Sequence, residues 1–139
     1  MMISTRGRYA LRVMIDLAQQ HSNDFIPLRD IADRQCISEK YLEAVIKALV
    51  SEGLLSGMRG KGGGYKLTKS PEEYTVGSIL RLTEGTLAPV SCLDCGTGSV
   101  ECERSNECIT LPLWKKLNVV VYRYLDSITL ADVIDGKIE

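Results

Sequence analysis

The chain has 139 residues, 45% hydrophobic and 25% charged, which suits one compact domain with an appendage and excludes a disordered protein. No stretch is apolar enough to cross a membrane and the N-terminus lacks the apolar segment of a signal peptide, so we expect a cytoplasmic protein without disulfides. The net charge of -1 is uneven: residues 1–70 hold 11 Lys and Arg against 7 Asp and Glu, or +4, and residues 71–139 hold 6 against 11, or -5. A basic half followed by an acidic half is typical of a DNA-binding region joined to a sensing or pairing region.

The first predicted element is an amphipathic helix over residues 5–20. Its apolar face is formed by Ala10, Val13, Met14 and Leu17. Arg6 and Arg8 lie at its start, where the helix dipole disfavours cations, so a nearby DNA phosphate is one explanation for them and chance is the other. His21 follows among polar residues and is interpreted as a loop residue rather than a ligand or catalytic base.

Residues 27–68 predict a winged helix-turn-helix. A short helix over residues 28–34 and a turn over residues 35–37 precede Ser38, whose oxygen suits an N-cap, and a second helix from Glu39 to about Ser51. Cys36 in the turn is interpreted as a small buried apolar residue. The polar face of the second helix suits a DNA groove, although most such faces contact only water. The candidate DNA contacts on this helix are Ser38, Glu39, Lys40, Tyr41, Glu43 and Lys47.

Two short strand-like runs, residues 54–56 and 65–68, flank a glycine-rich segment and predict a β-hairpin wing. Glycine permits positive φ and close approach of the backbone to a partner, while Arg59 and Lys61 at the tip can enter a minor groove or bind phosphates. A nucleotide-binding phosphate loop is the competing interpretation. It would need a Gly-Lys-Ser/Thr ending and a following helix, and both are missing here.

After the wing, Thr75 caps a predicted helix that ends at Gly85, and a cysteine-rich segment follows. Cys92, Cys95, Cys102 and Cys108 have the spacing C-x2-C-x6-C-x5-C. Four thiols so close together in a cytoplasmic chain indicate a metal or cluster. An iron-sulfur cluster tolerates this irregular spacing, structural zinc usually needs two tight pairs, and reactive thiols without metal remain a third possibility.

A long helix is predicted whose first turn contains Pro112, a position where proline is tolerated. It is apolar over a wide arc that consists of two adjacent rows of side chains. The first row is Leu113, Leu117, Val120 and Tyr124, and the second row is Trp114, Val121, Leu125 and Ile128. Because no further domain of size follows to cover this arc, we expect it to pair with a second copy of the chain; folding back onto its own domain is the alternative. Thr129 and Asp132 start a last short helix.

These segments together resemble the IscR-like family of bacterial winged helix-turn-helix transcription regulators, which includes IscR, the nitric oxide sensor NsrR and CymR. The resemblance runs nearly end to end and rests on residues 4–10, 37–43 and 59–65 and on the cysteine segment followed by Leu113-Trp114. It implies a homodimer joined by the long helix, recognition helices in successive major grooves of double-stranded DNA, and Arg59 in a minor groove. It also implies that Glu43 discriminates among DNA sequences.

Cluster-binding members of that family carry three cysteines in this segment, to which Cys92, Cys102 and Cys108 correspond. Two other family ligands do not carry over: the histidine of IscR is Leu111 here, and the N-terminal acidic ligand of NsrR-like proteins is Arg8. Cys95 is additional and is the candidate fourth ligand. CymR-like members lack this cysteine set.

The sequence therefore predicts a mainly α protein with a small β-hairpin wing. We expect a winged helix-turn-helix domain over residues 1–85, a cluster-binding loop over residues 86–109, and a dimerisation helix with a short C-terminal helix over residues 110–139. The predicted function is that of a homodimeric DNA-binding transcription regulator, a repressor. It senses iron-sulfur cluster, redox or nitric oxide status through a bound iron-sulfur cluster, for which [2Fe-2S] is the preferred type. A cluster-free thiol- or zinc-dependent regulator and a metal-thiol redox protein are the alternatives; catalysis is not indicated.

Overall fold

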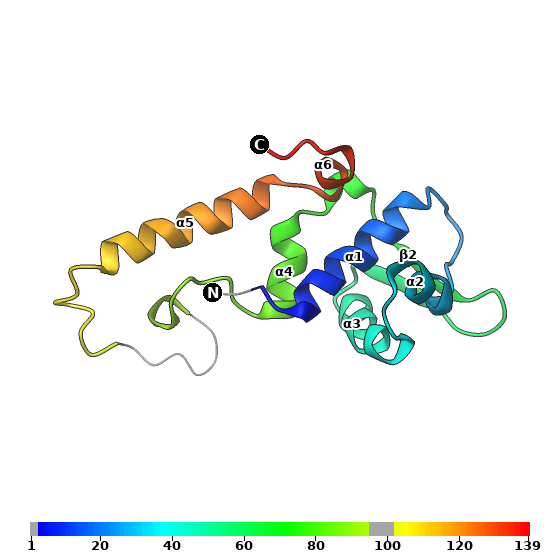
Figure 1. Ribbon diagram of the computed structural model, residues 1–139, viewed down its shortest axis with the longest axis horizontal. Coiled ribbons are helices and arrows are strands. Elements are labelled where there is room, and N and C mark those ends of the chain that lie inside the picture. The colour runs from blue at the N-terminus through cyan, green and yellow to red at the C-terminus, as the bar shows by residue number, and fades with distance from the viewer. Residues whose placement is uncertain (1–2, 95–101) are drawn as a thin grey trace.

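The computed structural model describes residues 3–94 and 102–139 (Figure 1). Its helices are α1 (Thr5–Gln19), α2 (Leu28–Gln35), α3 (Glu39–Ser51), α4 (Val76–Glu84), α5 (Leu111–Ser127) and α6 (Leu130–Asp135). Strands β1 (Leu55–Met58) and β2 (Gly64–Leu67) form an antiparallel hairpin, and short 3-10 turns occur at η1 (Pro71–Glu73) and η2 (Ser91–Leu93). In Figure 1 the other helices and the hairpin gather into one body, from which α5 projects.

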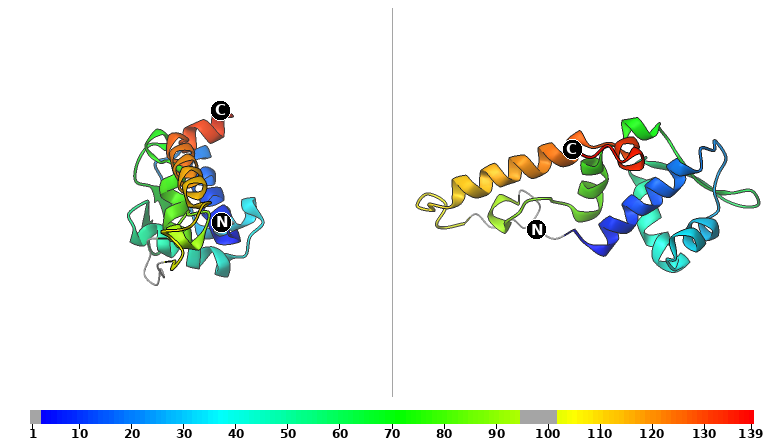
Figure 2. Two further views of the ribbon diagram at one scale, coloured as in Figure 1. Left: turned by 90° about the vertical axis from the view of Figure 1, so that its left-hand side faces the viewer. Right: turned by 45° about the horizontal axis from the view of Figure 1, so that its top comes forward.

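The main core lies where α1 crosses α2, α3 and α4. Met14 on α1, Ile31 on α2 and Leu42 on α3 are each fully buried there, so the apolar stripes predicted from helical spacing meet in one cluster. Leu130 at the start of α6 belongs to the same cluster, although it is the first residue of the last helix. The end of the chain therefore returns to the body that its beginning forms (Figure 2).

The wing is held against this body on both sides. Ile26, before α2, exchanges two backbone hydrogen bonds of 2.8 Å with Tyr65 on β2. Gly64, at φ +146°, makes this approach possible, because a Cβ there would lie 2.1 Å from the carbonyl oxygen of Ile26. On the other side, the hydroxyl of buried Tyr74 donates to the carbonyl oxygen of Leu54 at 2.8 Å.

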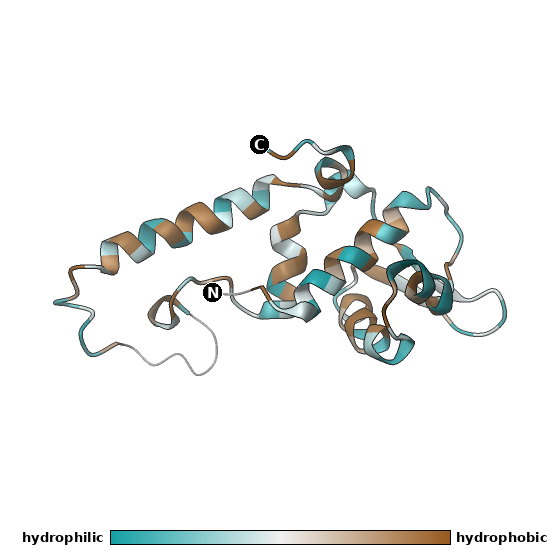
Figure 3. Ribbon diagram, in the orientation of Figure 1, coloured by the Kyte–Doolittle hydropathy of each residue, from teal (hydrophilic) through white to brown (hydrophobic). Residues whose placement is uncertain are grey.

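Helix α5 packs on α4 along only one of its two apolar rows. Val121, Tyr122 and Leu125 contact a second buried cluster that contains Leu80 on α4. The other row stays exposed, and Figure 3 shows the hydrophobic residues that run along the projecting helix. No helix within the described ranges, 3–94 and 102–139, is long and apolar enough to traverse a bilayer.

The mainly helical winged fold confirms the fold class predicted from the sequence. One local interpretation is wrong: Cys36 is exposed, not buried. It has φ +56° and ends α2 in a left-handed conformation, and its N–H donates to the carbonyl oxygen of Ala32. This conformation turns the thiol outward and leaves the next residue, Ile37, to enter the core.

Candidate DNA-binding face and cysteine pocket

Helix α3 presents its polar side to solvent along its whole length. Ser38 is the N-cap, and its hydroxyl oxygen accepts a hydrogen bond of 3.3 Å from the N–H of Tyr41. Leu42 and Leu49 face the core, which turns the intervening polar residues outward. The six candidate contacts are all exposed: Ser38, Glu39, Lys40, Tyr41, Glu43 and Lys47.

The recognition helix and the wing share one groove. Glu43 and Lys47 line it from α3, and Arg59 lines it from the hairpin, around a cavity of about 590 Å³. Lys61 lies exposed in the same hairpin loop, where Gly60 and Gly62 have positive φ. The fold thus brings a carboxylate and two cations from separate segments to one surface.

Arg6 and Arg8 are both exposed in the first turn of α1. Arg8 donates from Nη2 to the Thr5 hydroxyl oxygen at 3.0 Å, within its own helix, so it has no partner elsewhere in the described part of the chain. The neighbouring Tyr9 contacts Tyr41 of α3 through their rings. This contact was missed from the sequence, where Tyr9 reads as one more residue of an amphipathic helix.

Three of the four candidate cluster ligands line one cavity of about 340 Å³. The residues around it are Cys92, Leu93, Cys102, Ser105, Asn106, Cys108, Leu111 and Lys115. Cys95 lies outside the described residues. Within residues 3–94 and 102–139, no three His, Cys, Asp or Glu side chains are already close enough to hold one metal ion. The three thiols that line this cavity would supply three of the four protein ligands that an iron-sulfur cluster usually takes.

The surroundings of Cys108 act on the protonation of its thiol. The Thr110 hydroxyl lies 3.3 Å from its sulfur, and this hydrogen bond, assisted by backbone N–H groups and by the charge of Arg104, lowers the pKa of Cys108 below its ordinary value. A lower pKa favours the thiolate, which is the form that binds metal. The residues next to Cys108 therefore make its thiol more acidic than an ordinary cysteine.

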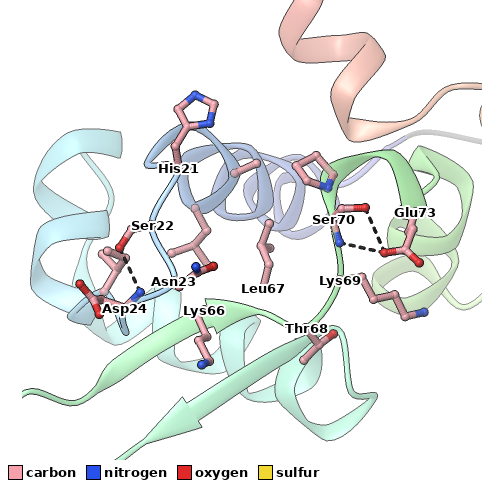
Figure 4. Close-up of a pocket in the computed structure, with 14 residues that line it drawn as sticks. His21, Ser22, Asn23, Asp24, Lys66, Leu67, Thr68, Lys69, Ser70 and Glu73 are labelled. Atoms are coloured by element: carbon pink, nitrogen blue, oxygen red, sulfur yellow. Dashed lines mark hydrogen bonds between the residues drawn. The ribbon is translucent and has the colours of Figure 1, made fainter.

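A further cavity, of about 650 Å³, lies between the loop after α1 and strand β2 (Figure 4). Two of its polar side chains are engaged locally: the Ser22 hydroxyl accepts from the N–H of Asp24, and Glu73 accepts from Ser70. The His21 ring points away from Lys66 and Glu73 in Figure 4, which agrees with its interpretation as a loop residue. We assign no ligand to this cavity.

Comparison with known proteins identifies the family. The model of the Rrf2 family, described as iron-dependent transcriptional regulators, matches residues 3–136. The transcriptional regulators named IscR from Yersinia pestis and from Serratia proteamaculans are each 34% identical over 137 residues, which cover 99% of this chain and 81% of theirs.

Comparison with solved structures points to the same family. CymR, the global cysteine regulator of B. subtilis, is 35% identical with a TM-score of 0.76 and 98% coverage of both chains. T. potens IscR is 35% identical with a TM-score of 0.76, covering 99% of this chain and 88% of the other. A transcriptional regulator from Listeria innocua is 34% identical with a TM-score of 0.82, covering 100% and 90%.

The relatives are helix-turn-helix transcription regulators rather than enzymes, as expected from the recognition helix and the wing. The match extends over nearly the whole chain, through the body, the cysteine segment and α5. The chain belongs to the Rrf2 family of helix-turn-helix transcription regulators.

Proposed function

We propose that this regulator binds its operator as a homodimer and senses iron-sulfur cluster, redox or nitric oxide status through a [2Fe-2S] cluster held by Cys92, Cys102 and Cys108. The observation that carries the proposal is the convergence of these three thiols on one cavity. Cys95, the remaining thiol of the segment, is the fourth ligand in this proposal, since Leu111 at the cavity wall has no donor atom. When bound, the cluster supplies a redox couple next to α5.

Contacts between the helices offer a route from the cysteine segment to the DNA face. The Tyr122 hydroxyl on α5 accepts from the N–H of Leu87, just after α4, at 3.1 Å. Glu84, the last residue of α4, accepts from the N–H and the hydroxyl of Ser4, the N-cap of α1, at 3.1 and 2.6 Å. Because α1 in turn packs against α3, binding of a cluster between α4 and α5 would change the support of the recognition helix.

The exposed row of α5 supports a homodimer. Leu113, Leu117, Val120 and Tyr124 are between 38% and 59% exposed, an apolar stripe that α4 does not cover. Pairing of this stripe with the same stripe of a second copy would place two recognition helices in successive major grooves of one duplex. Because the proposed partner is a DNA operator, the proposed location is the cytoplasm. Sedimentation of the full chain, and of a Leu117→Glu variant that should dissociate, tests this arrangement.

The cluster is tested by anaerobic reconstitution followed by absorption spectroscopy and by iron and acid-labile sulfide analysis. Cys92→Ala, Cys102→Ala and Cys108→Ala should each abolish the cluster, and Cys95→Ala should weaken or alter its binding. Cys36→Ala is the matched control, because Cys36 is an exposed thiol outside the cavity and its loss should change nothing. A stoichiometric zinc protein without acid-labile sulfide would contradict the proposal.

The alternative is a regulator that uses these thiols without a cluster. It is favoured by the likeness to CymR, whose structure from Staphylococcus aureus is described as an oxidized form, at 35% identity and a TM-score of 0.74. Exposure of Cys92 is compatible with such direct thiol chemistry. Thiol titration and zinc analysis of the same anaerobic preparation separate the two functions.

A further inference from the structure

The beginning of the recognition helix is tied to α1 through Gln35, the last residue of α2. The Gln35 side-chain oxygen accepts from Nε of Arg12 at 3.0 Å, and its side-chain nitrogen donates to Oδ2 of Asp16 at 2.8 Å. Arg12 can only donate and an ionised Asp16 can only accept, so the two partners on α1 determine which way the amide points. Both ends of one side chain are thus held by the same helix.

Arg12 also caps α2. Its Nη2 donates to the backbone carbonyl oxygen of Gln35, one of the carbonyls that the end of a helix leaves without a helical partner. The chain then turns through Cys36 in the left-handed conformation and reaches Ser38, the N-cap of α3. The Arg12 guanidinium therefore holds the point at which the chain leaves α2 for the recognition helix.

Asp16 anchors this arrangement from the interior. It is 2% exposed, and its carboxylate accepts from Nη2 of Arg34 at 2.8 Å and from Nε of Arg34 at 3.1 Å, in addition to Gln35. A buried carboxylate is tolerated only when its charge is paired and its oxygens accept hydrogen bonds, and both conditions are met. The end of α2 consequently has little freedom to move relative to α1.

The same face of α1 also contacts the first turn of α3. The Arg12 guanidinium carbon lies 5.4 Å from the centre of the Tyr9 ring, one turn earlier on α1. The Tyr9 ring meets the Tyr41 ring edge-on, with 5.3 Å between the ring centres and 80° between their planes. Tyr41 is the third residue of α3, where a recognition helix approaches base edges.

We propose that Arg12 and Tyr9 are positioning residues that orient the first turn of α3 in the major groove and thereby set how well the protein distinguishes its operator from other DNA. Base contacts depend on bidentate geometry, whereas phosphate contacts tolerate small rotations of the helix. Loosening this support should consequently weaken operator binding more than it weakens binding to unrelated duplexes.

The test compares the affinity of the full chain for a duplex selected from random sequence with its affinity for a scrambled duplex of equal length, over a salt series. Arg12→Met, Gln35→Leu and Tyr9→Leu should each lower the ratio of the two affinities by about tenfold, the order of one lost base contact. Gln35→Leu leaves the net charge unchanged, so its effect cannot come from a changed overall attraction between the protein and the DNA phosphates. Thermal melting of each variant gives the stability change separately.

Two conservative variants decide the mechanism. Arg12→Lys keeps the charge but not the planar donor pair, and should lose discrimination as Arg12→Met does while keeping the wild-type salt slope. Tyr9→Phe keeps the ring contact and should keep wild-type discrimination. Full discrimination in Arg12→Lys, loss of it in Tyr9→Phe, or melting temperatures that fall while the affinity ratio stays constant would each overturn the proposal.

Discussion

Removal of the Tyr74 hydroxyl should destabilise the protein and loosen the wing. This oxygen donates to the Leu54 carbonyl at 2.8 Å and accepts from the N–H groups of Thr68 and Lys69 at 2.9 and 3.0 Å. Tyr74 is 1% exposed, and the three backbone groups belong to the two segments that flank the β1–β2 hairpin. Tyr74→Phe fills the same space and deletes these three bonds, together with a contact of 3.1 Å to the Thr68 hydroxyl, which already donates to the carbonyl oxygen of Gly53.

The size of the loss follows from the three bonds. Each hydrogen bond contributes about 0.5–1.5 kcal/mol, so an upper limit is roughly 4.5 kcal/mol. Thr68 and Lys69 are exposed residues, and water can replace part of what their N–H groups lose. We therefore expect a decrease in the free energy of unfolding of about 2–3 kcal/mol, or roughly 5–10 °C in melting temperature.

The measurement is urea denaturation followed by circular dichroism, at one fixed protein concentration so that any association contributes equally. Tyr65→Phe is the control, since its hydroxyl makes no hydrogen bond within the described ranges. A change below about 0.5 kcal/mol for Tyr74→Phe, within the scatter of ordinary substitutions, would refute the role assigned to the hydroxyl. Equal decreases in the free energy of unfolding for Tyr74→Phe and Tyr65→Phe would also refute it.

The remaining predictions concern the DNA face and one capping box. Arg59→Ala should weaken DNA binding and reduce the preference for a narrow, A/T-rich minor groove. Lys47→Ala should weaken binding to all DNA sequences alike and lower the magnitude of the salt slope by about one unit. Unchanged affinity in both variants would show that the surface formed by α3 and the hairpin does not bind DNA. Glu43→Ala should broaden the range of bound sites, because a carboxylate that accepts from cytosine contributes about 1–3 kcal/mol of selectivity, and selection from random duplexes should return a looser consensus than for the wild type. Hydrogen bonds from the Ser70 backbone N–H and hydroxyl lower the pKa of Glu73 below its ordinary value of 4.5. These bonds therefore stabilise the folded protein above pH 4.5, and this stabilisation is lost as the pH falls through the folded-state pKa. Ser70→Ala should raise the Glu73 pKa in an NMR titration.

Much of this protein was predictable because its elements depend on local patterns. The apolar spacing of Leu42, Val45, Ile46 and Leu49 determines α3 and its outward polar face, and Ser38 and Thr75 act as the N-caps that their side chains predict. The glycine-rich segment specifies a hairpin because few other residues adopt its positive φ angles. The cysteine spacing indicated one site for four thiols; three of them, Cys92, Cys102 and Cys108, line one cavity, and Cys95 lies outside the described residues.

Tertiary structure alone decided the contacts between distant segments. The angle at which α1 crosses α2 decides whether Asp16 faces solvent or Arg34, and whether Arg12 reaches Gln35, 23 residues away in the sequence. No short sequence pattern encodes this angle. The same holds for the bridge between Thr75 and Thr129, which returns the chain end to the core after α5 has left it. A helix or a cap depends on residues a few positions apart in the sequence, so a local pattern can predict it. Contacts between distant segments depend on how whole helices pack, and that packing is determined by all the buried side chains together.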